Sequence, residues 1–233
     1  MQVGNRSSVT IGLEAVSVQV DDAGSPRRIL GPVSLELTER VIAVVGANGS
    51  GKSTLLRLIA GLVEPTSGEV TFSPQVPRTG FIFANPQAQL IMPVVGEDIE
   101  FSLKDSVTDR AERRRRAAVI LESVGLGDRR DSSVYQLSSG ERQKVALAGV
   151  LAAEPELVLA DEPTTLLDLR AATEFQQRLM RLEVPLLIAT HDLDFAAGAE
   201  RVLVFDNGQV VADDEPAAAI AHYRRLALRE AGS

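Results

Sequence analysis

Hydrophobic and polar residues alternate in two segments near the start of the chain. Residues 10–20 (TIGLEAVSVQV) and 33–37 (VSLEL) have the period of two that is typical of half-buried strands. The turn-rich segment DDAGSPRR, residues 21–28, lies between them, so the pattern predicts an antiparallel hairpin. A continuous apolar run at residues 41–45 predicts a further strand.

The rest of the pattern predicts an alternation of helices and parallel strands. Two apolar runs, 157–160 and 186–190, are separated by a helical segment at 169–182, and this spacing predicts a parallel sheet with right-handed crossovers. The other predicted elements are a helix at 53–61, strands at 69–72 and 81–83, a helical region at 85–154, a hairpin at 201–212 that turns at Asn207-Gly208, and a helix that begins at Pro216.

Composition indicates an intracellular globular enzyme. The chain has 233 residues and no cysteine, which excludes disulfides and thiolate metal sites. No apolar run reaches the ~18 residues of a membrane span, and the start lacks a signal-peptide pattern, so we expect any membrane role to come from a partner. The net charge of −8 argues against general binding to nucleic acid or to an anionic membrane. The basic run at residues 112–116 is interpreted as a solvated helix face, with a docking surface as the alternative.

Residues 46–54 read GANGSGKST directly after the strand predicted at 41–45. Such a glycine-rich loop between a strand and a helix turns backbone N–H groups toward phosphates, at the positive end of the helix dipole. Lys52 would add a charge to the phosphates, and Ser53 would place a hydroxyl on the Mg²⁺ that accompanies a nucleoside triphosphate. The nucleotide-binding residues predicted here are Gly46, Asn48, Gly49, Ser50, Gly51, Lys52, Ser53 and Thr54.

A second motif indicates which class of phosphate-loop enzyme the chain resembles. It is the segment LSSGERQKVALAGVL at residues 137–151. Ser138 and Glu141 have the spacing of a capping box, and a helix start with small outward-facing residues is also an anion site. The segment resembles the LSGGQ signature of the ABC transporter ATPases, with Ser139 and Glu141 in place of the usual Gly and Gln. The resemblance implies that Ser138, Ser139, Gly140 and Glu141 contact the γ-phosphate of ATP held by a second subunit, and therefore implies a dimer.

The segment LVLADEPTTLLD at residues 157–168 ends a predicted buried strand in two adjacent carboxylates, whose side chains should point in opposite directions. By resemblance to the Walker B strand of that family, Asp161 holds Mg²⁺ and Glu162 acts as the general base on the attacking water. Asp168 matches the D-loop at the dimer interface, and His191 matches the switch histidine that senses the γ-phosphate.

The resemblance implies an α/β fold: a P-loop NTPase core with a parallel sheet, an N-terminal antiparallel β subdomain and an inserted helical subdomain. We expect one ABC ATPase domain over residues 1–233, with the helical subdomain at 85–155. The segments FANPQAQ (83–89) and VGEDIEFSL (95–103) are most similar to energy-coupling-factor (ECF) importers of vitamins and metal ions. Residues 163–170 (PTTLLDLR) and the tail HYRR at 222–225 resemble the biotin-uptake ATPases.

Such ATPases bind the cytoplasmic face of the membrane through a transmembrane coupling protein, beside a substrate-binding membrane protein. The resemblance leaves open which vitamin or metal ion is carried, and whether the second ATPase subunit is identical or a paralogue. Two other functional classes fit the motifs: a soluble non-transport ABC ATPase of repair or translation, and a nucleotide-dependent regulator with little turnover. The first is disfavoured because the chain has neither a long coiled-coil insertion nor a second cassette.

Two positions depart from the family pattern. Ala84 stands where the Q-loop glutamine belongs, so either Mg²⁺ retains an extra water or Gln87 or Gln89 takes over. The aromatic residue that stacks on adenine is replaced by Val18 or Val20, which leaves selectivity for adenine over guanine open.

Overall fold

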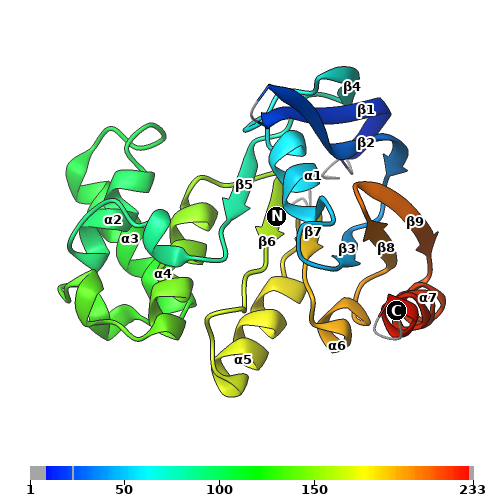
Figure 1. Cartoon of the computed structure of the whole chain (residues 1–233). Coiled ribbons are helices and arrows are strands. Elements are labelled where there is room, and N and C mark those ends of the chain that lie inside the picture. Colours follow the sequence, from blue (N-terminus) through cyan, green and yellow to red (C-terminus); the bar gives the residue numbers. More distant parts are fainter. Residues whose placement is uncertain (1–8, 23, 231–233) are drawn as a thin grey trace. The chain divides into compact units, whose positions relative to one another are not determined.

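The computed structural model describes residues 9–22 and 24–230, and these form two compact units (Figure 1). The first unit holds the described residues up to Pro77 together with those from Glu183 onward. The second unit is Arg78–Leu182. Within the described residues no helix is both long and apolar enough to cross a membrane.

The first unit contains a three-stranded antiparallel sheet with the order β2-β1-β4 (Figure 1). Strand β1 is Thr10–Asp22, β2 is Ser25–Leu37 and β4 is Ser67–Ser73. The predicted hairpin between the first two strands is confirmed, but most of the segment predicted as a turn belongs to the strands. Asp21 Oδ1 accepts a hydrogen bond from the Gly24 N–H at 2.8 Å, which closes a tight turn. The polar residues 25–28 fit within a strand because their side chains are exposed.

The second sheet region of the first unit surrounds the buried strand β3, Val41–Gly46. Strands β7 (Leu186–Ala189) and β8 (Arg201–Asp206) both pair with β3 in parallel, and β9 (Gln209–Asp214) pairs antiparallel with β8. The predicted Asn207-Gly208 turn is confirmed, and both residues have positive φ, as a two-residue hairpin turn requires. The helices of this unit are α1 (Lys52–Ile59), α6 (Leu193–Ala196) and α7 (Pro216–Glu230).

The second unit combines two parallel strands with helices. Strand β5 is Thr79–Ile82 and pairs in parallel with the fully buried β6, Leu157–Asp161. The α-helices are α2 (Val95–Ser102), α3 (Arg110–Ser123), α4 (Ser139–Ala152) and α5 (Leu169–Met180). Three short 3₁₀ helices lie between them: η1 (Pro86–Ala88), η2 (Gly127–Arg129) and η3 (Val134–Gln136). The predicted α/β class, with parallel strands and an N-terminal antiparallel sheet, is confirmed.

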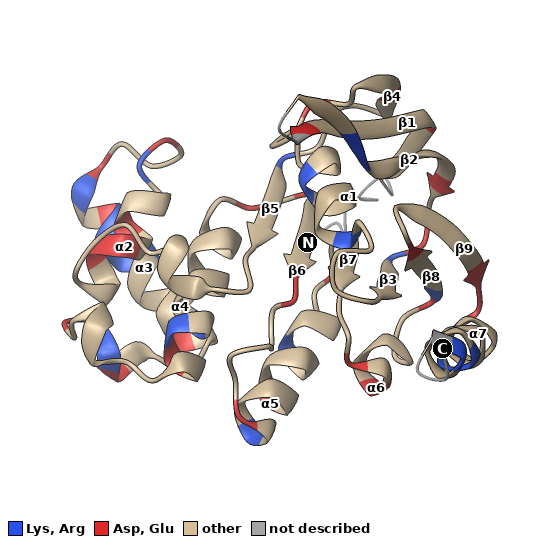
Figure 2. Cartoon of the chain, viewed as in Figure 1, with Lys and Arg blue, Asp and Glu red and all other residues tan. Residues whose placement is uncertain are grey.

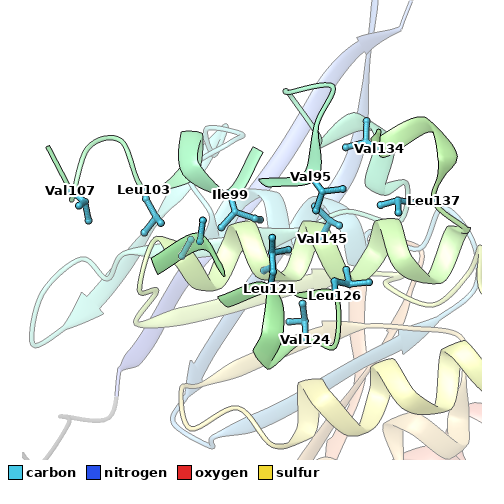
Figure 3. Packing of buried hydrophobic residues seen from close by; sticks show 13 residues of the cluster. Val95, Ile99, Leu103, Val107, Leu121, Val124, Leu126, Val134, Leu137 and Val145 are labelled. Carbon is cyan, nitrogen blue, oxygen red and sulfur yellow. The ribbon is translucent and has the colours of Figure 1, made fainter. Parts of the chain in front are cut away.

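A cluster of buried aliphatic side chains joins α2, α3 and α4 (Figure 3). Val95 and Ile99 of α2, Leu121 of α3 and Val145 of α4 are all inaccessible to solvent. This core fixes α4, which carries the signature segment at its N-terminus, within the second unit.

Candidate nucleotide-binding site

The phosphate loop begins where the buried strand β3 ends and α1 starts. Gly49 and Gly51 have φ of 80° and 105°, a region that residues with a Cβ rarely adopt. A Cβ on Gly46 would clash with the carbonyl oxygen of Phe205 in the neighbouring strand. The N-terminus of α1 has no side-chain cap, and the N-terminus of a helix is a common site of phosphate binding. Asn48 and Gly49 are exposed at the tip of the loop.

Lys52 and Ser50 give this loop the chemistry of a phosphate site. The Lys52 side chain is buried, and its Nζ donates to the carbonyl oxygens of Gly46 at 2.8 Å and Ala47 at 2.9 Å. The Ser50 hydroxyl is buried and has no hydrogen-bond partner among the described residues. Buried polar atoms nearly always have a partner, so the Ser50 hydroxyl fits a bound ligand. Ser53 and Thr54 follow in the first turn of α1, both partly accessible.

His191 is exposed two residues after β7 ends, and both of its neighbours are fixed. The Thr190 N–H donates to the carbonyl oxygen of Val44 in β3, the strand that leads into the phosphate loop, at 3.0 Å. Asp192 caps α6 by accepting from the N–H groups of Asp194 and Phe195, each at 3.0 Å. The first unit therefore carries the loop and His191 on neighbouring parallel strands.

Asp161 and Glu162 lie in the second unit, at the C-terminal end of β6. Asp161 is the last residue of the strand and is buried. Glu162 has φ of 50°, a left-handed conformation that is unfavourable for a residue with a long side chain. The Thr165 hydroxyl donates to Glu162 Oε2 at 3.2 Å, which helps to hold the carboxylate. Backbone strain of this kind is concentrated at functional sites, and it supports a special role for Glu162.

The predicted capping box at the start of α4 is confirmed. The Ser138 hydroxyl accepts from the Glu141 N–H at 3.2 Å, and the Ser138 N–H donates to Glu141 Oε2 at 2.9 Å. The hydrogen bond from the Ser138 N–H lowers the pKa of Glu141 below its usual range, so this side chain is a carboxylate. Ser138 and Ser139 are exposed and Gly140 is partly accessible, which leaves the helix start open to a ligand.

Asp168 caps α5 by accepting from the Ala171 N–H at 2.8 Å. Two nearby leucines, Leu166 and Leu169, are 54% and 85% exposed. Leu166 lies within the segment 165–168 that resembles the D-loop, and both leucines are accessible to a partner.

The segment after β5 is held by two glutamine side chains. Gln89 Oε1 accepts from the Phe83 N–H at 3.5 Å, and Gln143 Nε2 donates to the Phe83 carbonyl oxygen at 3.3 Å. Gln87 is exposed instead. Of the two residues proposed to replace a glutamine at Ala84, Gln89 is therefore the one whose side chain is held beside the end of β5.

Gln143 is a residue that sequence reasoning missed. It is 1% exposed, and a polar side chain on the buried face of a helix is the signal that could have drawn attention to it.

Burial distinguishes the two valines that could occupy the adenine position, because Val18 is buried while Val20 is 42% exposed.

Part of the basic run at 112–116 is paired within α3 (labelled in Figure 2), because Glu112 forms ion pairs with two of the four arginines. Glu112 bonds to Arg115 and Arg116, each at 2.8 Å, and the hydrogen bond from Arg115 contributes most to lowering the pKa of Glu112 to about 2. Arg113 donates to the backbone carbonyl oxygens of Val107 and Thr108. These contacts favour the interpretation as a solvated helix face.

Comparison with known proteins assigns the family. Residues 30–165 match the family described as ABC transporter. The chain belongs to the ABC transporter ATP-binding family. The family prediction is thereby confirmed, and with it the prediction of an ATPase coupled to transport. An ABC ATPase domain of this kind binds ATP.

Individual members of the family resemble the chain over most of its length. The biotin transport ATP-binding protein BioM of Rhizobium etli is 40% identical over 223 residues, 91% of this chain and 100% of that protein. The energy-coupling factor transporter ATP-binding protein EcfA1 of Lactiplantibacillus plantarum is 36% identical, over 79% of this chain and 71% of that protein. A dimeric post-hydrolysis structure of the ATP-binding cassette MJ0796, bound to ADP and Pi, superposes with a TM-score of 0.79. It is 28% identical and covers 88% of this chain and 98% of that one.

Proposed function

We propose that this ABC ATPase is the ATP-hydrolysing subunit of an ECF-type importer and that it works as a nucleotide-sandwich dimer. The observation that carries the proposal is the phosphate loop, which combines a buried Lys52, a buried Ser50 hydroxyl and a helix start without a side-chain cap. The similarity to proteins named for biotin transport and for energy-coupling factor transport supports the importer assignment.

We propose a role in ATP binding for each of the predicted site residues. The backbone N–H groups of residues 46–54 and the Lys52 ammonium would bind the phosphates of ATP, and His191 would sense the γ-phosphate. Ser53 and Asp161 would hold Mg²⁺, which neutralises phosphate charge when it is bound.

Glu162 is the proposed general base. It would accept a proton from the water that attacks the γ-phosphate, and its left-handed backbone and the Thr165 hydroxyl would hold the carboxylate in place for this. In the proposed dimer, residues 138–141 and Asp168 would complete the site of the opposite subunit. The dimeric MJ0796 cassette bound to ADP and Pi supports this arrangement.

The proposed partners are a second ATPase subunit, identical or paralogous, a transmembrane coupling protein and a substrate-binding membrane protein. Ile91 and Phe101, which follow Ala84 in the second unit, are 66% and 40% exposed and would offer apolar contact to the coupling protein. The chain would then lie at the cytoplasmic face of the membrane as a peripheral subunit. Biotin is the proposed cargo because a biotin transport protein matches over its whole length.

Ala84 favours a second candidate function, a nucleotide-dependent regulator with little turnover. A methyl group cannot bind Mg²⁺ or orient water, so hydrolysis could be too slow to drive transport. Turnover in the presence of the membrane partners distinguishes this function from the importer.

Purification of the tagged chain from its own cells in mild detergent tests the importer proposal. We expect small polytopic membrane proteins to be recovered with the wild-type chain, and phosphate release by the recovered complex to rise when biotin is supplied. Recovery of the chain without membrane proteins would reject the importer, and a complex without phosphate release would favour the regulator.

A further inference from the structure

Both carboxylate oxygens of Glu141 are engaged at the start of α4. Oε2 accepts from the N–H and the hydroxyl of Ser138, at 2.9 Å and 2.8 Å. Oε1 lies 3.1 Å from Nε of Arg129. Arg129 ends the 3₁₀ helix η2, so the positive charge comes from outside α4.

The neighbouring basic residues of α4 have other partners. Arg142 donates to the carbonyl oxygens of Val134 and Tyr135, each at 3.2 Å. Lys144 pairs with Glu174 of α5 at 3.2 Å. The cation in contact with the Glu141 carboxylate is therefore Arg129.

This pair matters because an acid at a phosphate-binding helix start has opposing effects. A carboxylate in the first turn stabilises the helix through the dipole and the capping box. The same charge repels an anionic ligand that approaches the helix N-terminus. In a partly exposed site a unit charge a few Å away changes anion affinity by about tenfold, and salt weakens the effect.

We propose that Arg129 is a positioning residue that neutralises Glu141 and so keeps the start of α4 receptive to a phosphate group of ATP held by the opposite subunit. This rests on the proposed ATPase dimer. The ion pair leaves the Glu141 carboxylate in the capping box and offsets most of the repulsion between this carboxylate and the nucleotide phosphate. The arginine acts through Glu141 and does not itself touch the phosphate.

The test compares Arg129→Gln in two backgrounds, wild type and Glu141→Gln, by measuring KM for ATP and kcat. At low ionic strength, Arg129→Gln should raise KM about five- to tenfold in the wild-type background, and the increase should shrink in ~0.5 M salt. In the Glu141→Gln background the same substitution should change KM by less than about twofold, because no acid remains to be neutralised. Arg129→Lys, which retains the charge, should restore most of the affinity.

Arg114→Gln is the matched control, since Arg114 is exposed on α3 and the change removes the same charge from the same unit. Thermal unfolding of each variant separates loss of affinity from loss of folding. An equal rise in KM in both backgrounds would mean that Arg129 binds phosphate directly. No rise in either background would mean that Arg129 does not affect ATP binding. Either result would overturn the proposal. A wild-type chain that neither hydrolyses ATP nor dimerises with it would instead reject the proposed ATPase dimer.

Discussion

Gln143 Nε2 donates a hydrogen bond to the carbonyl oxygen of Phe83, 3.3 Å away and 60 residues earlier in the chain. The contact joins the helix that begins with the signature segment to the end of β5. In the register of β5 against β6, Ile82 pairs with Ala160, so Phe83 follows beside the strand end that carries Asp161. A buried side chain thus connects the segment of Ala84 to the signature helix.

Replacing Gln143 by Leu should weaken the connection between the signature helix and the segment of Ala84. The Phe83 carbonyl oxygen would lose its bond from Gln143, and we expect the free energy of unfolding to fall by about 1–3 kcal/mol, measured by urea denaturation. Turnover stimulated by the membrane partners should fall more than basal turnover. Gln136→Leu, at an exposed position in η3, is the control. Equal losses in basal and stimulated turnover would indicate a purely structural role for Gln143.

The position of Gln89 favours this residue over Gln87 as the replacement for the glutamine that is missing at Ala84. Gln89→Ala should reduce Mg²⁺-dependent hydrolysis more than Gln87→Ala, because the Gln89 side chain is held at the Phe83 N–H while Gln87 is exposed. A loss above ~10²-fold in the Gln89 variant would show that the function has moved along the loop.

Ala84→Gln gives the complementary measurement. A glutamine at residue 84 would link the bound Mg²⁺ to the surface that contacts the membrane protein, and Ala84 lacks this link. The new glutamine should therefore change partner-stimulated turnover more than basal turnover. An Ala84→Gln variant with unchanged stimulated turnover would argue against weakened coupling.

Substitutions in the phosphate loop and in the signature segment should affect nucleotide binding and turnover differently. Lys52→Ala removes a buried ammonium from the phosphate loop and should weaken nucleotide binding. Ser139→Arg should retain binding of nucleotide to the chain's own phosphate loop and hydrolyse poorly. Fluorescence titration of folded protein and phosphate release measure the two properties. Equal loss of nucleotide affinity in both variants would contradict a site completed by a second subunit.

The ion pairs of Glu112 predict a pH-dependent contribution to stability. Its pKa is lowered from the ordinary value of 4.5 to about 2, so the pairs stabilise the folded chain above about pH 4.5 and lose this effect as the pH falls toward 2. Glu112→Gln should therefore be less stable than wild type at pH 7, by a small margin because the pairs are exposed, and the difference should shrink in acid. A stability difference that is independent of pH would show that these pairs contribute nothing.

The local features of the site could be predicted from the sequence, because neighbouring residues determine them. The strand before Gly46, the capping box at Ser138 and the turn at Asn207 each depend on a few adjacent residues. The contact between Gln143 and Phe83 could not be predicted, since it joins residues far apart in the chain. The prediction of a turn over residues 21–28 is wrong for most of the segment, because exposed strands tolerate the same residues as turns.

The central claim, that Glu162 is the base of an ATP-sandwich dimer, is tested most directly with Glu162→Gln. The amide fills the same space but cannot accept the proton of the attacking water, so ATP should bind and remain uncleaved. Gel filtration with ATP and Mg²⁺, combined with phosphate release, should show a stable dimer for the variant and turnover without dimer accumulation for wild type. Hydrolysis at the wild-type rate in Glu162→Gln, or a variant that stays monomeric with ATP bound, would contradict the account.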